Sequence, residues 1–199
     1  MEFCREHGIA HELCGKVIVA TSEDESSRLD SILSRGQANG VRCEPLNRKG
    51  LLELEPACAG LRAIRVADAG IVDYEAVCET ILGELLELGA TVHFGTEVIR
   101  CTAVGERACV DTASRSFSAR YVINCAGLYS DRVAIGSGVD VAARIIPFRG
   151  EYFELQPSAH QLCRHLIYPV PDPHFPFLGV HLTRMVGGGV EAGPNAVLA

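Results

Sequence analysis

Several features that would mark a membrane, metal or disulfide protein are missing from this sequence. No apolar run approaches the roughly 18 residues of a transmembrane helix, and residues 1–7 have neither the basic nor the apolar region of an export signal. The nine cysteines include no C-x-x-C pair, which argues against a zinc ribbon or a redox dithiol. We therefore expect a cytoplasmic protein whose cysteines are small apolar fillers in a reducing compartment.

Basic residues and tryptophan are also scarce. The 18 Lys and Arg are outnumbered by 25 Asp and Glu, so no basic face for a nucleic-acid backbone is expected. Tryptophan is absent, but 48% hydrophobic and 22% charged residues in a chain of 199 is ordinary globular composition. This composition excludes disordered, collagen-like and coiled-coil classes, and the length supports one good-sized core or two small ones.

Complete fingerprints for nucleotides, metals and hydrolysis are absent as well. The sequence contains no G-x-G-x-x-G, G-x-x-x-x-G-K-[ST], H-E-x-x-H or G-x-S-x-G. Residues 2–7 resemble the tail of a helix with nothing before it, and residues 190–199 stop on an apolar run. We therefore expect a fragment of a longer protein and no metal site.

Hydrophobic spacing and capping signals predict alternating helices and strands. Helices are expected after the S-x-x-E capping box at Ser22, over 47–55, after an N-cap at Asp73, and over 130–134. Gly187–Gly189 predicts a tight hairpin turn. Strands are expected at 15–20, 61–66, 91–94, 97–100, 109–110, 117–120, 121–125, 145–155, 166–170, 177–183 and 190–192. Together these elements predict an α/β plus α+β protein in which an antiparallel sheet comes last.

A strand–glycine–helix junction over 121–131 is the most informative local pattern. Small residues at such a turn expose backbone N–H groups at a helix start, which suits a phosphate or pyrophosphate. A plain connection that needs Gly127 for its backbone geometry is the alternative. Asp131 is expected to act as an N-cap rather than as a catalytic acid.

Three ionisable residues on the later strands are candidates for chemistry. Arg149 and Arg184 could clamp a carboxylate, because a planar guanidinium matches its two oxygens. His181 could take a proton from a hydroxyl group. The alternative is that the strand charges point into water and that His181 is merely hydrogen-bonded.

The segment 124–132 (NCAGLYSDR) resembles the second FAD-contacting segment of the D-amino-acid-oxidase-like flavoproteins. Other stretches resemble one branch of that superfamily, the L-2-hydroxyglutarate dehydrogenases and oxidases. They are 70–74 (GIVDY), 146–152 (IPFRGEY), 167–173 (IYPVPDP), 175–183 (FPFLGVHLT) and 193–198 (GPNAVL). The family's N-terminal Gly-rich unit, a following segment that brings a His close to the flavin, and its C-terminal part have no counterpart in this sequence.

The resemblance implies a partial FAD-binding Rossmann-like domain joined to an antiparallel-sheet substrate domain. It assigns 1–70 to a substrate or cap region, 71–144 to the FAD-binding domain and 145–199 to the start of the substrate sheet. It implies hydride transfer from C2 of L-2-hydroxyglutarate to flavin N5, giving 2-oxoglutarate. Electrons would leave to oxygen or to an electron-transport acceptor, the latter implying a peripheral position at the inner membrane.

The same resemblance assigns roles to individual residues. FAD would be contacted by Val98, Ala126, Gly127 and Leu128, and His181 would be the catalytic residue. Substrate contacts would come from Arg149, Tyr152, Tyr168, Thr183 and Arg184. Two alternatives stay open: a related oxidase acting on an amine or a polyol phosphate, and a non-enzymatic chain, either a truncated product or one piece that needs a partner chain to supply the cofactor domain.

Overall fold

The computed structural model describes residues 1–175 and 177–198 and divides into two compact units. Unit 1 comprises Met1–Glu84 and Arg149–Val197, and unit 2 comprises mainly Leu85–Phe148. Pro176, in the stretch 175–183 that resembles the flavoprotein family, and Ala199 lie outside the described residues. The assignment of 1–70, 71–144 and 145–199 to functional domains stays a prediction.

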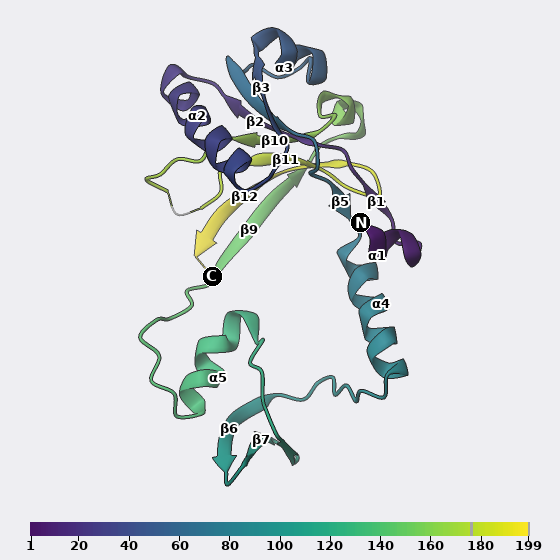
Figure 1. Cartoon of the computed structure of the whole chain (residues 1–199), viewed down its shortest axis with the longest axis vertical. Helices are drawn as coiled ribbons and strands as arrows, with labels where there is room; N and C mark the ends of the chain where they lie inside the picture. The colour runs from purple at the N-terminus through teal and green to yellow at the C-terminus, as the bar shows by residue number, and fades with distance from the viewer. Residues whose placement is uncertain (176, 199) are drawn as a thin grey trace. The chain divides into compact units, whose positions relative to one another are not determined.

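A seven-stranded mixed sheet forms the centre of unit 1 (Figure 1). Strand β2 runs parallel to β10, whereas the pairs β2–β4, β3–β4, β10–β11 and β11–β12 are antiparallel. The sheet therefore joins the first fifth of the chain to its last fifth through one parallel ladder. Its order is β3 (Cys43–Asn47), β4 (Arg62–Val66), β2 (Lys16–Ala20), β10 (Leu166–Pro169), β11 (His181–Arg184), β12 (Val190–Leu198) and β9 (Phe148–Glu154).

Two helices cover opposite faces of this sheet, because successive strand residues point to opposite sides. On one face, Leu29 of α2 (Glu23–Ala38) packs with Ala20 and Ile64. On the other, Leu51 of α3 (Arg48–Leu54) packs with Val17, Val19 and Ala63. Both helices lie over β2 and β4, so the core is concentrated at that end of the sheet. The remaining elements of unit 1 are α1 (Glu2–Glu6), the pair β1 (His11–Glu12) and β5 (Ile71–Val72), and the 3₁₀ helix η2 (Pro157–Leu162).

Two helix caps predicted from the sequence, Ser22 and Asp73, are confirmed, and a third side-chain cap is found at Asn47. The Ser22 hydroxyl accepts the Glu25 N–H at 3.2 Å, and the Glu25 carboxylate accepts the Thr21 N–H at 2.6 Å. Asn47 caps α3 by accepting the Gly50 N–H. Asp73 likewise accepts the Ala76 N–H at the start of α4 (Tyr74–Glu87). Side-chain acceptors satisfy donors that a helix start leaves unpaired, which explains why these helices begin where they do.

Unit 2 contains a small antiparallel sheet followed by a short helix. Strands β6 (Val98–Val104), β7 (Arg107–Thr112) and β8 (Ser116–Ala119) are consecutive and pair in that order. The 3₁₀ helix η1 (Gly127–Tyr129) then leads into α5 (Ser130–Gly136). Ser137 fixes α5 beside the sheet, because its hydroxyl accepts the Cys101 N–H at 2.8 Å.

The mixed α/β class is confirmed, and so is the hairpin turn at Gly187–Gly189, where Met185 N–H donates to Gly189 O. Three strand predictions are wrong in part. Residues 91–94 and 121–125 are not strands, because no described strand lies beside them to share ladder hydrogen bonds. The strand expected over 177–183 begins only at His181, and residues 177–180 belong to the loop that precedes it.

The apolar stripe predicted on α4 is present in sequence but is not covered. Ile81 is 43% exposed, Leu85 44% and Leu88 84%, and no residue of α4 is buried. Among the described residues, no helix is both long enough and apolar enough to cross a membrane.

Candidate functional site

The open half of the unit 1 sheet brings together residues from four strands on one face. Ile167 pairs with Leu182, so Tyr168 lies opposite His181 across the β10–β11 ladder. Their rings stack with centroids 4.2 Å apart and planes inclined by 16°. Because side chains alternate along a strand, Thr183 shares this face with His181. Three of the residues expected at the site, Tyr168, His181 and Thr183, therefore lie together.

His181 is held in one orientation by a backbone acceptor. Its ring nitrogen Nδ1 lies 3.0 Å from the carbonyl oxygen of Gly179, and the side chain is only 8% exposed. A carbonyl oxygen can only accept, so Nδ1 carries a proton, and in the neutral form of the ring the lone pair is on Nε2. The neutral imidazole is thus oriented to accept a proton at Nε2.

Tyr168 is a protonated phenol over a wide pH range. Burial raises its pKa above the usual value, a hydrogen bond with Thr183 lowers it in part, and the neighbouring Tyr152 raises it further. A phenol and a hydroxyl in this position offer donors to a substrate oxygen.

Tyr152 reaches the same face across a glycine. An added Cβ on Gly193 would lie 2.6 Å from Cδ1 of Tyr152 and 2.8 Å from the carbonyl oxygen of Glu151. Gly193 pairs with His181 across the β11–β12 ladder. The absence of a side chain at this position therefore leaves the space that the Tyr152 ring occupies next to His181.

Tyr168 and His181 also border a cavity of about 330 Å³, whose lining residues Ile167, Pro169 and Leu182 alternate with them along the strands and so point to the opposite face of the sheet. Most of its wall is apolar, and its polar groups include Thr21 and Glu25 at the start of α2. A mostly apolar pocket with a few convergent polar groups is the usual setting for a small-molecule site. The remaining lining residues are Val19, Cys58, Ile167, Pro169, Val180 and Leu182.

One charged residue on this face was not predicted from the sequence. The ammonium group of Lys16, the first residue of β2, lies 4.9 Å from the centroid of the Tyr168 ring. Lys16 pairs with Leu166 in the parallel β2–β10 ladder, on the face that Tyr168 shares. A single lysine at the start of an otherwise apolar strand is the signal that could have identified it.

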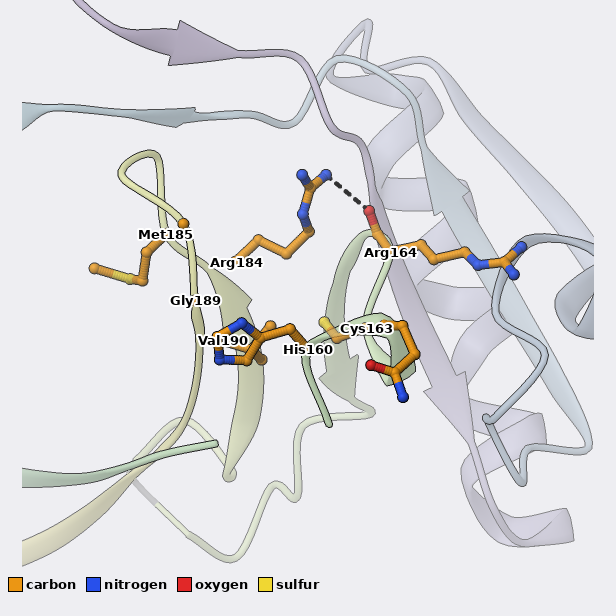
Figure 2. Close-up of a pocket in the computed structure, with 9 residues that line it drawn as sticks. His160, Cys163, Arg164, Arg184, Met185, Gly189 and Val190 are labelled. Carbon is orange, nitrogen blue, oxygen red and sulfur yellow. Dashed lines mark hydrogen bonds between the residues drawn. The ribbon is translucent and has the colours of Figure 1, made fainter. Parts of the chain in front are cut away.

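The two arginines expected at the substrate site point elsewhere. Arg184 follows Thr183 and so points to the opposite face of the sheet. There it donates to both carboxylate oxygens of Glu12 (2.8 and 3.1 Å) and to the carbonyl oxygen of Arg164 (3.0 Å). Figure 2 shows this bond to Arg164, at a separate cavity of about 410 Å³. Arg149 forms an ion pair with Glu151 at 2.6 Å. Arg149 lies three positions before Tyr152 in β9, so its side chain points to the opposite face of the sheet.

A buried carboxylate, which the sequence analysis did not identify, holds the strand that carries Tyr168. Glu55 is fully buried and accepts the backbone N–H groups of Arg164 and His165. It also contacts Nδ1 of His165 at 2.7 Å. These bonds fix the start of β10, which carries Tyr168. The Glu-Pro step that ends α3 gives no hint of such long-range partners.

In unit 2, two of the expected cofactor contacts line one cavity. Val98 and Ala126 face a space of about 730 Å³ together with Tyr129 and Arg132. Gly127 has a φ of +55°, and an added Cβ there would meet no atom within 4 Å. Leu128 is 59% exposed in η1. The first N–H groups of a helix are not used within it, so Gly127 and Leu128 offer free donors to an anionic group.

The Asn124–Asp131 segment is fixed by its own side chains. Asn124 donates to Ser130 O and accepts the Ala126 N–H. Asp131 is not the N-cap of α5, which is Tyr129. Its carboxylate instead accepts the N–H groups of Ile145 and Arg132, and these bonds, that of Ile145 first, lower its pKa. Within the described ranges no three His, Cys, Asp or Glu side chains are grouped to hold a metal ion.

Comparison with known proteins identifies the class to which this fold and these sites belong. The family model for FAD dependent oxidoreductases matches residues 1–198, and the chain belongs to that family. An L-2-hydroxyglutarate dehydrogenase of Indibacter alkaliphilus is 47% identical over 100% of this chain and 50% of its own length. The mitochondrial L-2-hydroxyglutarate dehydrogenase of Homo sapiens is 38% identical over 100% of this chain and 46% of its own.

A solved structure supports the fold independently. The L-alpha-glycerophosphate oxidase of Mycoplasma pneumoniae, described with FAD bound, superimposes with a TM-score of 0.82 at 22% identity. The match covers 95% of this chain and 51% of the other. The resemblance to this flavoprotein family read from the sequence is confirmed. The chain spans about half the length of the curated relatives it matches.

Proposed function

We propose that this chain supplies the substrate face, and part of the FAD site, of an enzyme that oxidises L-2-hydroxyglutarate to 2-oxoglutarate. The observation that carries the proposal is the stacked Tyr168–His181 pair with Thr183 on the open half of the sheet. This pair brings an oriented imidazole and two hydroxyl groups together on one face, and Tyr168 and His181 border a cavity of small-molecule size. The relatives at 47% and 38% identity carry the name of this activity.

In this proposal, His181 accepts the proton of the C2 hydroxyl at Nε2, the nitrogen that Gly179 leaves available. Tyr168 and Thr183 hydrogen-bond the same oxygen and hold C2 in one orientation. The apolar wall of the cavity excludes water from the reacting carbon. When bound, FAD supplies the two-electron acceptor for the hydrogen at C2.

The residues of unit 2 fit the ADP part of FAD. The cavity at Val98 and Ala126 is large and open, and no Cβ obstructs Gly127. Arg132, stacked over Tyr129 at 5.1 Å, brings a cation to the same cavity. In the proposed complex, the first N–H donors of η1 hold an anionic group of the cofactor.

A chimera tests the reaction directly. The matching half of the Indibacter alkaliphilus relative is replaced by this chain, and flavin bleaching without oxygen is followed after adding substrate. We expect bleaching with L-2-hydroxyglutarate but not with glycine or glycerol phosphate. In the chimera, His181→Asn should slow bleaching by about a hundred-fold or more, since a positioned base contributes that much. Bleaching by the amine or polyol phosphate instead would support the related oxidases.

The final electron acceptor can be tested with the same chimera. Oxygen and a membrane electron-transport acceptor both accord with the proposal, and the second would place the protein at the periphery of the inner membrane. Peroxide released during turnover in air identifies oxygen. Turnover only with added quinone identifies the electron-transport route.

A further inference from the structure

The open face of the sheet carries one cation without a counter-ion. The Lys16 ammonium contacts the Tyr168 ring, and no carboxylate among the described residues pairs with it. Arg149 and Arg184, by contrast, are each neutralised by a glutamate on the other face. Lys16 as a residue is half-buried, and its ammonium group can form a charge-assisted hydrogen bond with an anionic group. An anionic ligand would supply the counter-ion that no described carboxylate provides to Lys16.

The position of Lys16 determines which part of a ligand it can reach. Strands β2 and β11 flank β10 on opposite sides, so the Tyr168 ring lies between the Lys16 ammonium and the His181 imidazole. Lys16 is therefore separated from His181 by the thickness of an aromatic ring. It cannot contact the atoms next to His181, but it can contact the far end of an extended ligand.

We propose that Lys16 binds the substrate carboxylate that is remote from the reacting carbon and so selects dicarboxylates. This inference rests on the proposed function, which places C2 at His181. Tyr168 then contacts both ends of the site, because its ring lies against the ammonium group and also stacks on the imidazole. A 2-hydroxy acid lacking the second carboxylate would still reach His181 but would gain nothing from Lys16.

The sequence makes a direct experiment practicable because it contains two lysines, Lys16 and Lys49. Reductive methylation of the whole chain with ¹³C-formaldehyde gives each lysine its own NMR signal. The Tyr168 ring current should displace the Lys16 signal from that of Lys49, which lies on α3. L-2-hydroxyglutarate and the monocarboxylate L-2-hydroxybutyrate are then titrated at equal ionic strength, while Tyr168 and His181 ring signals report ligand binding.

We expect L-2-hydroxyglutarate to shift the Lys16 signal and leave the Lys49 signal unchanged. Lys16→Met should weaken L-2-hydroxyglutarate binding by about ten- to a hundred-fold, the usual loss of a charge-assisted contact. It should leave L-2-hydroxybutyrate binding unchanged. Lys16→Arg should retain most of the affinity, and Lys49→Met is the matched control that should retain all of it.

The outcomes separate the two proposals. If L-2-hydroxyglutarate shifts the Tyr168 and His181 signals while Lys16 stays unmoved, and Lys16→Met binds normally, the Lys16 assignment is overturned and the proposed function stands. If L-2-hydroxyglutarate shifts none of these signals and does not bleach the flavin of the chimera, the proposed function itself is overturned. If Lys16→Met loses the same factor of affinity for L-2-hydroxyglutarate and for L-2-hydroxybutyrate, the proposal that Lys16 binds the remote carboxylate is also overturned.

Discussion

Glu12 and Arg184, 172 positions apart in the sequence, form a two-point ion pair with nitrogen–oxygen distances of 2.8 and 3.1 Å. The pair joins β1 to the end of β11 on the face of the sheet that turns away from His181. Arg184 is thereby committed to a structural contact. The resemblance to the flavoprotein family had assigned this arginine a substrate contact.

Replacement of Arg184 should consequently leave ligand binding intact. For Arg184→Gln we expect L-2-hydroxyglutarate affinity within about two-fold of the unmodified chain and a loss of stability of about 1 kcal/mol or less, because both partners are partly exposed. Calorimetric titration and urea unfolding measure the two quantities. A ten-fold loss of affinity would show that Arg184 does contribute to substrate binding.

The buried Glu55 carboxylate should matter far more for stability. Glu55→Ala leaves two backbone N–H groups and the His165 ring without their acceptor, and removal of one partner from such a buried pair costs about 3 kcal/mol or more. Urea unfolding should show this loss. Glu53→Ala, at an exposed position of the same helix, is the control and should change stability by less than about 0.5 kcal/mol. Equal effects of the two variants would contradict the structural role of Glu55.

Gly193 should be intolerant of even a methyl group. Gly193→Ala would push into the Tyr152 ring and the Glu151 carbonyl, and overpacking of this kind costs about 1–3 kcal/mol. We also expect the Tyr152 ring signals to shift in NMR spectra. Gly187→Ala serves as the control, since an added Cβ there meets no atom within 4 Å. Unchanged Tyr152 signals in Gly193→Ala would argue against the packing described.

Cys163 should make the fold sensitive to alkali. Burial raises the pKa of its thiol from 9.0 to about 12, and the nearby Glu55 carboxylate adds to this effect. Above pH 9.0 the unfolded chain loses this proton while the folded chain keeps it, so the free energy of unfolding should fall as the pH rises towards about 12. Urea midpoints measured across this range should show the slope. Cys163→Ala should flatten it, and a replacement of the exposed Cys78 should not.

Local signals in the sequence predicted the local structure well. Side-chain caps at Ser22, Asn47 and Asp73 depend on residues three positions away, so they are legible in the sequence. The segment 121–125 has the composition of a strand but is not one here, because a strand also needs a neighbour to pair with. Composition records the preference of a segment, and pairing depends on the rest of the fold.

The site was predictable only in part for the same reason. Tyr168, His181 and Thr183 were named from motif resemblance, and they do lie together. The direction in which Arg184 points follows from strand alternation, which requires a known register. The role of Glu55 depends on partners 109 and 110 positions away, and no local pattern encodes a contact of that kind.

The parallel β2–β10 ladder has a consequence for the order in which the molecule assembles. Lys16 leaves the ribosome early, but the aromatic ring on which its ammonium rests is translated about one hundred and fifty residues later. Ladders between such distant segments form slowly, because a long loop must close before any contact is gained. The ligand face can therefore form only after translation of this chain is nearly complete. Until then, the edge of β2 that later pairs with β10 has no strand beside it.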